Sequence, residues 1–157
     1  MKSILKRKKQ GKTDYATRMN LLKSKTPRLV IRKSNRFIIA QIVESKEAQD
    51  KTISYANSKE LSKEGWTFSF KNVPAAYLTG ILIAEKAKSK GIKKAILDLS
   101  RYTSSKASKL YAVAKGAIDN GLEINCDEKV FPSQNRIYGE HTKNSEKIKK
   151  IIEKLTK

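Results

Sequence analysis

Two runs of β-forming residues around a polar pair constrain the fold of this chain more than any other feature. The runs, Arg28–Ser34 and Arg36–Val43, flank Ser34-Asn35, and asparagine tolerates the positive φ that a tight hairpin turn needs. A turn of two residues would place Arg28 opposite Gln41. This part of the chain is therefore expected to form an antiparallel hairpin.

The side chains of this hairpin divide into two faces, because they alternate along each strand. One face is apolar and is expected to lie on the core. The other mixes guanidinium, aromatic and amide groups, which can stack on RNA bases and pair with phosphates. An alternative is that this second face is covered by other parts of the protein, which the apolar residues Val30 and Ile39 favour. The expected core residues are Leu29, Ile31, Ile38, Ala40 and Ile42, and those opposite are Arg28, Val30, Arg32, Phe37, Ile39 and Gln41.

Positive charge is concentrated at the N-terminal end. The 157 residues include 35 lysines and arginines against 15 acidic residues, a formal net charge of +20. Residues 1–36 hold 13 basic side chains and one acid, whereas residues 37–142 hold 16 basic and 12 acidic side chains. The run Lys6-Arg7-Lys8-Lys9 is too repulsive to fold alone and is expected to order against phosphate. This distribution favours a polyanionic partner over the alternative, a solvated tail.

The remaining elements are expected from apolar spacing and from helix end signals. The order βββαβα predicts a mixed α/β sheet with helices on one face. We expect three segments: a basic N-terminal arm and helix over residues 1–26, an α/β RNA-binding domain over 27–142, and a basic C-terminal helix over 143–157. The first expected element is a helix over Asp14–Lys23, capped by Thr13 and docked through Tyr15, Met19 and Leu22.

The middle of the chain is expected to form an acidic loop at Glu44–Asp50, a strand at Thr52–Ala56 and a helical turn at Ser58–Glu64, after which Trp66, Phe68 and Phe70 seal the core. A long helix is expected from Asn72 to Gly91, with Gly80 in close approach to the sheet. The last expected elements are a strand at Lys94–Leu99, a helix over Ser105–Asn120, and a C-terminal helix with Ile148, Ile151, Ile152 and Leu155 on one side.

Composition argues against several classes of protein. The richest apolar run, Ile81–Ala84, is far shorter than the roughly 18 residues that span a bilayer. The basic N-terminus is followed by polar residues, which is unlike a secretory signal. The single cysteine, Cys126, forms no internal disulfide and fits a reducing compartment. We therefore expect a cytoplasmic, cationic globular protein without a membrane partner.

A catalytic site is not indicated by the sequence. The only histidine, His141, has no cysteine or aspartate at ligand spacing. Asp98 ends its strand where a ribonuclease-H-type enzyme would place a metal-binding carboxylate, but two-metal chemistry needs several carboxylates and no second one is placed to join it. Asp98 is expected to be structural, paired with Arg101 or bound by backbone N–H groups. We expect no catalysis, cofactor, metal or small-molecule substrate; the alternatives are a ribonuclease-H-like nuclease and a free-standing basic RNA-binding or chaperone module.

Several motifs together resemble one known family. They include Gly11-Lys12-Thr13-Asp14-Tyr15, Arg32-Lys33-Ser34-Asn35, Asn72-Val73-Pro74-Ala75-Ala76-Tyr77-Leu78-Thr79-Gly80 and Gly139-Glu140-His141. These segments are similar to those of the 5S-rRNA-binding large-subunit ribosomal proteins, number eighteen in the universal naming, in their archaeal and eukaryotic branch. The resemblance extends over residues 11–141, nearly the whole body of the chain.

The resemblance implies a ribonuclease-H-like fold without catalysis and a place in the central protuberance of the large ribosomal subunit. It implies that the basic N-terminal segment and the exposed sheet face hold 5S rRNA. The implied partners are 5S rRNA, large-subunit rRNA and the second 5S-binding protein of that subunit. The RNA-binding residues expected from charge, alternation and resemblance together are Lys6, Arg7, Lys8, Lys9, Lys12, Thr13, Tyr15, Arg18, Arg28, Arg32, Lys33, Ser34, Asn35, Arg36, Phe37 and Gln41.

Overall fold

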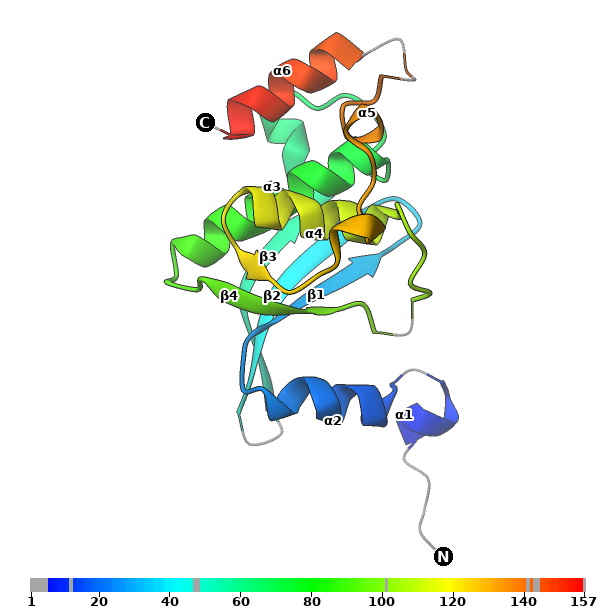
Figure 1. The fold of residues 1–157 in the computed structure, drawn as a ribbon, viewed down its shortest axis with the longest axis vertical. Coiled ribbons are helices and arrows are strands. Elements are labelled where there is room, and N and C mark those ends of the chain that lie inside the picture. The colour runs from blue at the N-terminus through cyan, green and yellow to red at the C-terminus, as the bar shows by residue number, and fades with distance from the viewer. Residues whose placement is uncertain are drawn as a thin grey trace, which may run out of the picture.

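A mixed sheet forms the centre of the computed structural model, which describes residues 6–11, 13–46, 49–100, 102–140, 142 and 145–156 (Figure 1). Its strands are β1 (Arg28–Lys33), β2 (Ile38–Lys46), β3 (Gln49–Asn57), β4 (Lys94–Asp98) and β5 (Glu123–Ile124). They lie in the order β3-β2-β1-β4-β5. β2 pairs antiparallel with β1 and β3, whereas β4 pairs parallel with β1 and β5. The predicted α/β mixed sheet is confirmed, and the two-residue β5 is an additional strand.

Helices pack on this sheet from more than one side. α3 and α4 cover the core face, and α2 and α6 lie at opposite ends of the molecule (Figure 1). Among the described residues, none of the helices is both long enough and apolar enough to cross a membrane. The helices are α1 (Lys6–Lys9), α2 (Tyr15–Lys23), η1 (Ser58–Glu64), α3 (Val73–Lys88), α4 (Lys109–Asp119), η2 (Glu128–Val130), α5 (Gln134–Ile137) and α6 (Ser145–Thr156).

The hairpin of β1 and β2 forms as predicted, but its register differs by two residues. Arg28 lies opposite Val43 instead of Gln41, because the turn contains four residues. The Ser34 hydroxyl closes this turn by accepting from the Phe37 N–H at 2.9 Å and donating to the Phe37 carbonyl at 3.0 Å. A shift of two residues keeps every side chain on its face, so the predicted core face is confirmed. Its residues Leu29, Ile31, Ile38, Ala40 and Ile42 are all fully buried.

The segment expected to be an acidic loop is instead strand. β2 continues to Lys46 and β3 begins at Gln49, so that Glu44 pairs with Lys51 and Ser45 with Asp50 across the two strands. An oppositely charged pair on adjacent strands stabilises such an extension. The prediction of a loop over residues 44–50 was therefore wrong over most of its length.

α4 begins later than its apolar spacing predicts. Ala107 has a φ of 55°, which a helix does not allow, and its N–H binds the Val130 carbonyl at 2.8 Å. The helix starts only at Lys109, after Ser108. The predicted start at Ser105 was wrong because a contact with a segment distant in sequence holds this loop.

The core also confirms the predicted aromatic and C-terminal apolar contacts. Trp66 is 2% exposed, and Phe68 and Phe70 pack against the buried cluster. Ile148 and Ile152 of α6 are buried in that same cluster. The three segments proposed from charge stay a prediction, but the last of them contributes side chains to a core that it shares with α3.

Reciprocal glycines bring α3 and α4 into close contact. A Cβ on Gly80 would overlap the carbonyl oxygen of Val113, and a Cβ on Gly116 would overlap that of Tyr77. Gly80 was expected to approach the sheet closely, but it approaches α4 instead. The buried face of α3 is broad enough to pack on both the sheet and α4, since twelve of the sixteen residues of α3 are buried.

Gly80→Ala is expected to lower the free energy of unfolding by about 2–4 kcal/mol, because the two helix backbones must separate to admit the methyl group. Chemical denaturation checks this value. Gly91→Ala is the matched control: its φ is +75° and nothing lies within 4 Å of the added Cβ, so it should cost only about 1–2 kcal/mol of backbone strain. Equal losses in the two variants would contradict the close helix contact.

Candidate nucleic-acid interface

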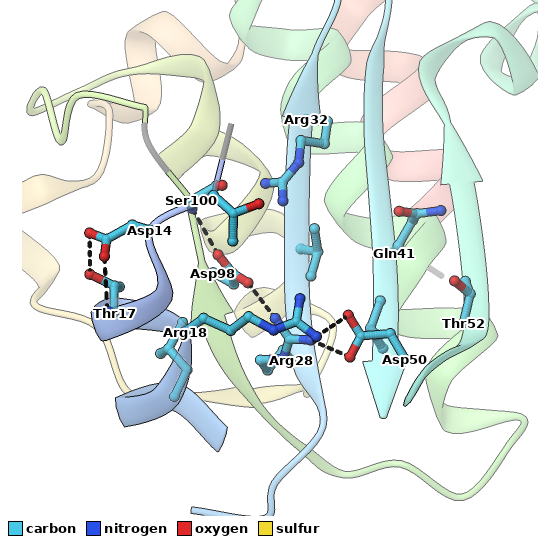
Figure 2. A pocket seen from close by; sticks show the side chains of 14 residues that line it. Asp14, Thr17, Arg18, Arg28, Arg32, Gln41, Asp50, Thr52, Asp98 and Ser100 are labelled. Atoms are coloured by element: carbon cyan, nitrogen blue, oxygen red, sulfur yellow. Dashed lines mark hydrogen bonds and ion pairs between the residues drawn. The ribbon is translucent and has the colours of Figure 1, made fainter. Parts of the chain in front are cut away.

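A cleft of about 290 Å³ lies between α2 and the sheet face opposite the core (Figure 2). Side chains from β1, β2 and β3 line it from the sheet, and Asp98 and Ser100 line it from the end of β4. α2 contributes Thr17, Arg18 and Leu21. The cleft thus occupies the polar face of the hairpin that alternation predicts.

Arg28 joins the elements around this cleft. One terminal nitrogen of its guanidinium lies 2.7 Å from an Asp98 oxygen, and the other lies 3.0 Å from Asp50 and 3.1 Å from the Ser45 hydroxyl. The Arg28 side chain is 5% exposed. Its Nε is buried and forms no hydrogen bond with any described residue. Arg28 therefore ties β1 to β2, β3 and β4; its bonds to Asp98 and Asp50 are drawn in Figure 2.

Asp50 extends the network to α2. Its second oxygen lies 2.8 Å from the Arg18 guanidinium, and Ser45 also donates a hydrogen bond to it. Burial alone would raise the pKa of Asp50, but the hydrogen bonds from Ser45 and Arg18 and the charges of Arg18 and Arg28 outweigh it and lower the pKa of this carboxyl from its ordinary value. Asp50 is therefore ionised at neutral pH and holds both guanidinium groups.

The charges lining this cleft are balanced. Arg18, Arg28 and Arg32 line it together with Asp14, Asp50 and Asp98. Arg28 was expected to be an exposed RNA contact, but the structure buries it in ion pairs. Arg18 is also paired, at one third exposed. Among the three guanidinium groups, only Arg32 forms no ion pair with a described residue; it donates to the Ile31 carbonyl at 3.0 Å.

The open sheet face beside this cleft presents aromatic and amide groups. Gln41 lies between Val30 on β1 and Tyr55 on β3 in the register of the sheet. Tyr55 is 43% exposed and lies opposite Gln41 in the register of the sheet; it is not among the RNA-binding residues predicted from the sequence, although alternation along β3 gives its face. Phe37 was expected to stack on bases, yet it is half-buried with its ring 5.8 Å from that of Phe70. Tyr55 is therefore the more exposed aromatic group on this face.

The tip of the hairpin is open to solvent. Lys33, Ser34, Asn35 and Arg36 are all exposed. The Lys33 ammonium lies 5.1 Å from the centre of the Tyr102 ring, an attraction between a cation and an aromatic face. The structure thus places these four predicted residues together at one end of β1.

α2 differs from its prediction at both its cap and its docking face. Asp14, not Thr13, caps the helix by accepting from the N–H groups of Ala16 and Thr17 at 3.1 and 3.3 Å. No residue of α2 is fully buried, and Met19 is 59% exposed. The predicted docking through Met19 was wrong, because the ion pair of Arg18 with Asp50 supplies the contact to the sheet.

The basic arm before α2 contains a short helix that the sequence was not expected to form by itself. Lys6–Lys9 form α1, and Gly11 closes the turn after it by donating to the Lys8 carbonyl at 3.0 Å. Lys8 and Lys9 are exposed, and Thr13 and Tyr15 are half-buried. Lys12 and the side chains of Lys6 and Arg7 lie outside the described residues.

Asp98 has the structural role expected of it. It accepts a hydrogen bond from the Ser100 N–H at 2.8 Å and pairs with Arg28. Arg101, its other expected partner, and His141 lie outside the described residues. Within the described part of the chain, no three His, Cys, Asp or Glu side chains gather as metal ligands would.

Comparison with known proteins decides the family. The family described as "Ribosomal large subunit proteins 60S L5, and 50S L18" matches residues 1–94. The large ribosomal subunit protein uL18 of Korarchaeum cryptofilum (strain OPF8) is 49% identical over 136 residues, which cover 87% of this chain and 70% of that protein. The chain belongs to the uL18 family. The uL18 proteins of Caldivirga maquilingensis (strain ATCC 700844 / DSM 13496 / JCM 10307 / IC-167) and Methanoregula boonei (strain DSM 21154 / JCM 14090 / 6A8) are 48% and 46% identical, each over 87% of this chain, and they are covered over 66% and 78% of their lengths.

Membership in the uL18 family establishes what class of protein this is. It is a protein of the large ribosomal subunit and a structural component, not an enzyme. The expected resemblance is thereby confirmed, and the nuclease alternative is excluded by family. In a uL18 protein, the ion pairs around Asp98 belong to the framework of the fold.

Asp98→Ala is expected to lower the free energy of unfolding by about 3 kcal/mol, because it leaves the buried Arg28 guanidinium with fewer partners. Thermal and urea unfolding measure the loss. Glu140→Ala is the control, since its ion pair with Lys149 is 41–43% exposed and should contribute about 0–1 kcal/mol. A loss at Asp98 no larger than at Glu140 would show that the Arg28 network does not support the fold.

Proposed function

We propose that this uL18 protein binds 5S rRNA and anchors it in the central protuberance of the large subunit. Its partners in this role are 5S rRNA, large-subunit rRNA and the second 5S-binding protein. The observation that supports the proposal best is the open sheet face. There Gln41 lies between Val30 of β1 and the exposed Tyr55 of β3, and it lines the same cleft as Arg32, a guanidinium without an ion pair to any described residue.

The chemistry of this face suits RNA. The π-face of an exposed tyrosine stacks on a base of any sequence, and such a contact contributes about 1–3 kcal/mol per base. A glutamine amide both donates and accepts, so it matches a 2′-hydroxyl or a base edge. Arg32 and the exposed lysines of the hairpin tip and the arm supply attraction to phosphate, which is strongly dependent on salt.

The paired arginines have a different role in this proposal. Arg28 and Arg18 are held by Asp50 and Asp98, so their charge is already compensated within the protein. They fix the position of α2, and hence of the basic arm before it, relative to the sheet. We assign Arg28 as a positioning residue and Arg32, Gln41 and Tyr55 as RNA contacts.

The strand order supports a ribonuclease-H-like framework for this function. Three antiparallel strands are followed by two that run parallel to β1, in the order β3-β2-β1-β4-β5. The framework carries the RNA on the sheet face that α3 and α4 leave uncovered. In this proposal, the domain over residues 27–142 and the basic N-terminal segment both contact the RNA.

Tyr55→Ala and Arg32→Gln are each expected to weaken 5S rRNA binding by roughly tenfold, through loss of stacking and of a phosphate contact. Filter binding or fluorescence anisotropy at fixed salt measures the change. Tyr55→Phe retains the ring and should bind nearly as well as the unaltered chain. Lys63→Gln removes an exposed charge elsewhere and serves as the control for Arg32→Gln.

Two results would contradict the proposed function. The first is an unaltered affinity in both Tyr55→Ala and Arg32→Gln, which would remove the sheet face from the interface. The second is binding to unrelated RNA of equal length as tight as to 5S rRNA. That result would favour the alternative of a free-standing basic RNA-binding or chaperone module.

A further inference from the structure

A second and larger cavity lies at the C-terminal end of β1. Its volume is about 840 Å³. It opens where the hairpin tip, the loop after β4 and the first turn of α4 meet, and Lys33, Lys71, Lys109 and Arg136 line it. The two sites share no lining residue. Arg32 lines the first site and Lys33 the second, and neighbouring side chains of a strand point to opposite faces of the sheet, so the two sites are distinct.

The cavity is strongly cationic, unlike the cleft beside α2. None of the described residues that line it is acidic, and none of its four basic side chains forms an ion pair with a described residue. Burial, and next the charges of Lys71 and Lys33, lower the pKa of Lys109. These cations repel one another in the free protein, so a bound anion would relieve the repulsion.

The start of α4 adds hydrogen-bond donors to the same cavity. Ser108 is the N-cap of α4 but makes no capping hydrogen bond with its side chain. Its Oγ is buried and has no partner among the described residues. The N–H groups of the first helical turn also lack partners within the helix, and they carry the positive end of its dipole. An anion at this position would satisfy both kinds of donor.

The walls of the cavity are held in place by contacts within the protein. The Tyr102 hydroxyl donates to the Lys33 carbonyl at 3.1 Å and accepts from its N–H at 3.3 Å. The N–H of Ala107 binds the Val130 carbonyl at 2.8 Å. The loop that carries Ser108 is thus fixed to both β1 and η2, which preorganises the cavity for a ligand.

We propose that this cavity binds a phosphate group of an RNA backbone, through Lys71, Lys109, Arg136 and the first turn of α4. This goes beyond the proposed function by adding a second RNA site, so that the protein holds two segments of RNA backbone at two separate places on its surface. It rests on the proposed function only in taking the anion to be RNA phosphate. The phosphate comes either from another part of 5S rRNA or from large-subunit rRNA.

The test compares two double variants of the full chain with equal charge. Lys71→Gln/Lys109→Gln removes two cations from the cavity, and Lys63→Gln/Lys93→Gln removes two exposed lysines that line neither site. Binding of 5S rRNA and of a large-subunit rRNA fragment is measured separately between 50 and 200 mM salt. For the RNA that occupies the cavity, the slope of log K against log salt should fall in magnitude by about 1.4–1.8 in the cavity variant.

The outcomes separate the two RNA sources. A reduced slope with 5S rRNA alone assigns the cavity to 5S rRNA, and one with the large-subunit fragment alone assigns it to that RNA. Slopes that match the control variant with both RNAs would overturn the proposal. Thermal unfolding of both double variants establishes that each is folded.

A titration with inorganic phosphate keeps this proposal apart from the proposed function. The backbone amide resonances at positions 109 and 110 should shift on addition of phosphate to the unaltered chain and should not respond in Lys71→Gln/Lys109→Gln. Amides that do not respond in the unaltered chain would contradict the anion site. A response in a chain that shows no preference for 5S rRNA would support the anion site while refuting the proposed function.

Discussion

The relative positions of the strands and of α2 depend on the ion pairs of the buried Arg28 guanidinium. It pairs with Asp98 at 2.7 Å and with Asp50 at 3.0 Å, and Asp50 in turn holds Arg18 of α2. Four strands and one helix thereby meet at one charged network. Burying such a group is costly unless its partners are in place, so the network also selects the relative positions of the elements that supply them.

The pairing of cations within the chain separates framework from interface. In a protein with a net charge of +20, the arginines beside Asp50 and Asp98 are already neutralised. The lysines and arginines at the hairpin tip and around the start of α4 have no carboxylate partner in the described chain. The second group is available to a polyanion, and the uL18 family membership indicates which polyanion the large subunit provides. The proposed RNA contacts follow from this division more than from the number of basic residues.

Local patterns in the sequence predict the elements and the faces of the sheet. Alternation assigns the core face from Leu29 to Ile42 correctly even though the register was off by two residues, because side-chain direction repeats every second residue. Contacts between distant residues are not encoded in such patterns. Asp98 is 70 residues from Arg28, and a search along the chain cannot tell that this arginine is buried.

Contacts between residues distant in the sequence also explain why the cationic cavity and the partner of Gly80 were not predicted. Lys33, Lys71, Lys109 and Arg136 come from four separate parts of the sequence, and only the fold brings them to one cavity. Gly80 was expected to permit a close approach, but its partner is a helix that begins far along the chain. The exposure of Tyr55 was within reach of the sequence, since it follows from the alternation of β3 once the extent of that strand is known.

We propose that the cations without a carboxylate partner among the described residues, including those of the second cavity, face RNA in the ribosome. Amine-specific acetylation followed by mass spectrometry, on the free chain and on purified large subunits, is the sharpest test. We expect Lys33, Lys71 and Lys109 to react in the free chain and to be protected in the subunit. Equal reactivity of Lys71 and Lys109 in the two states would contradict it.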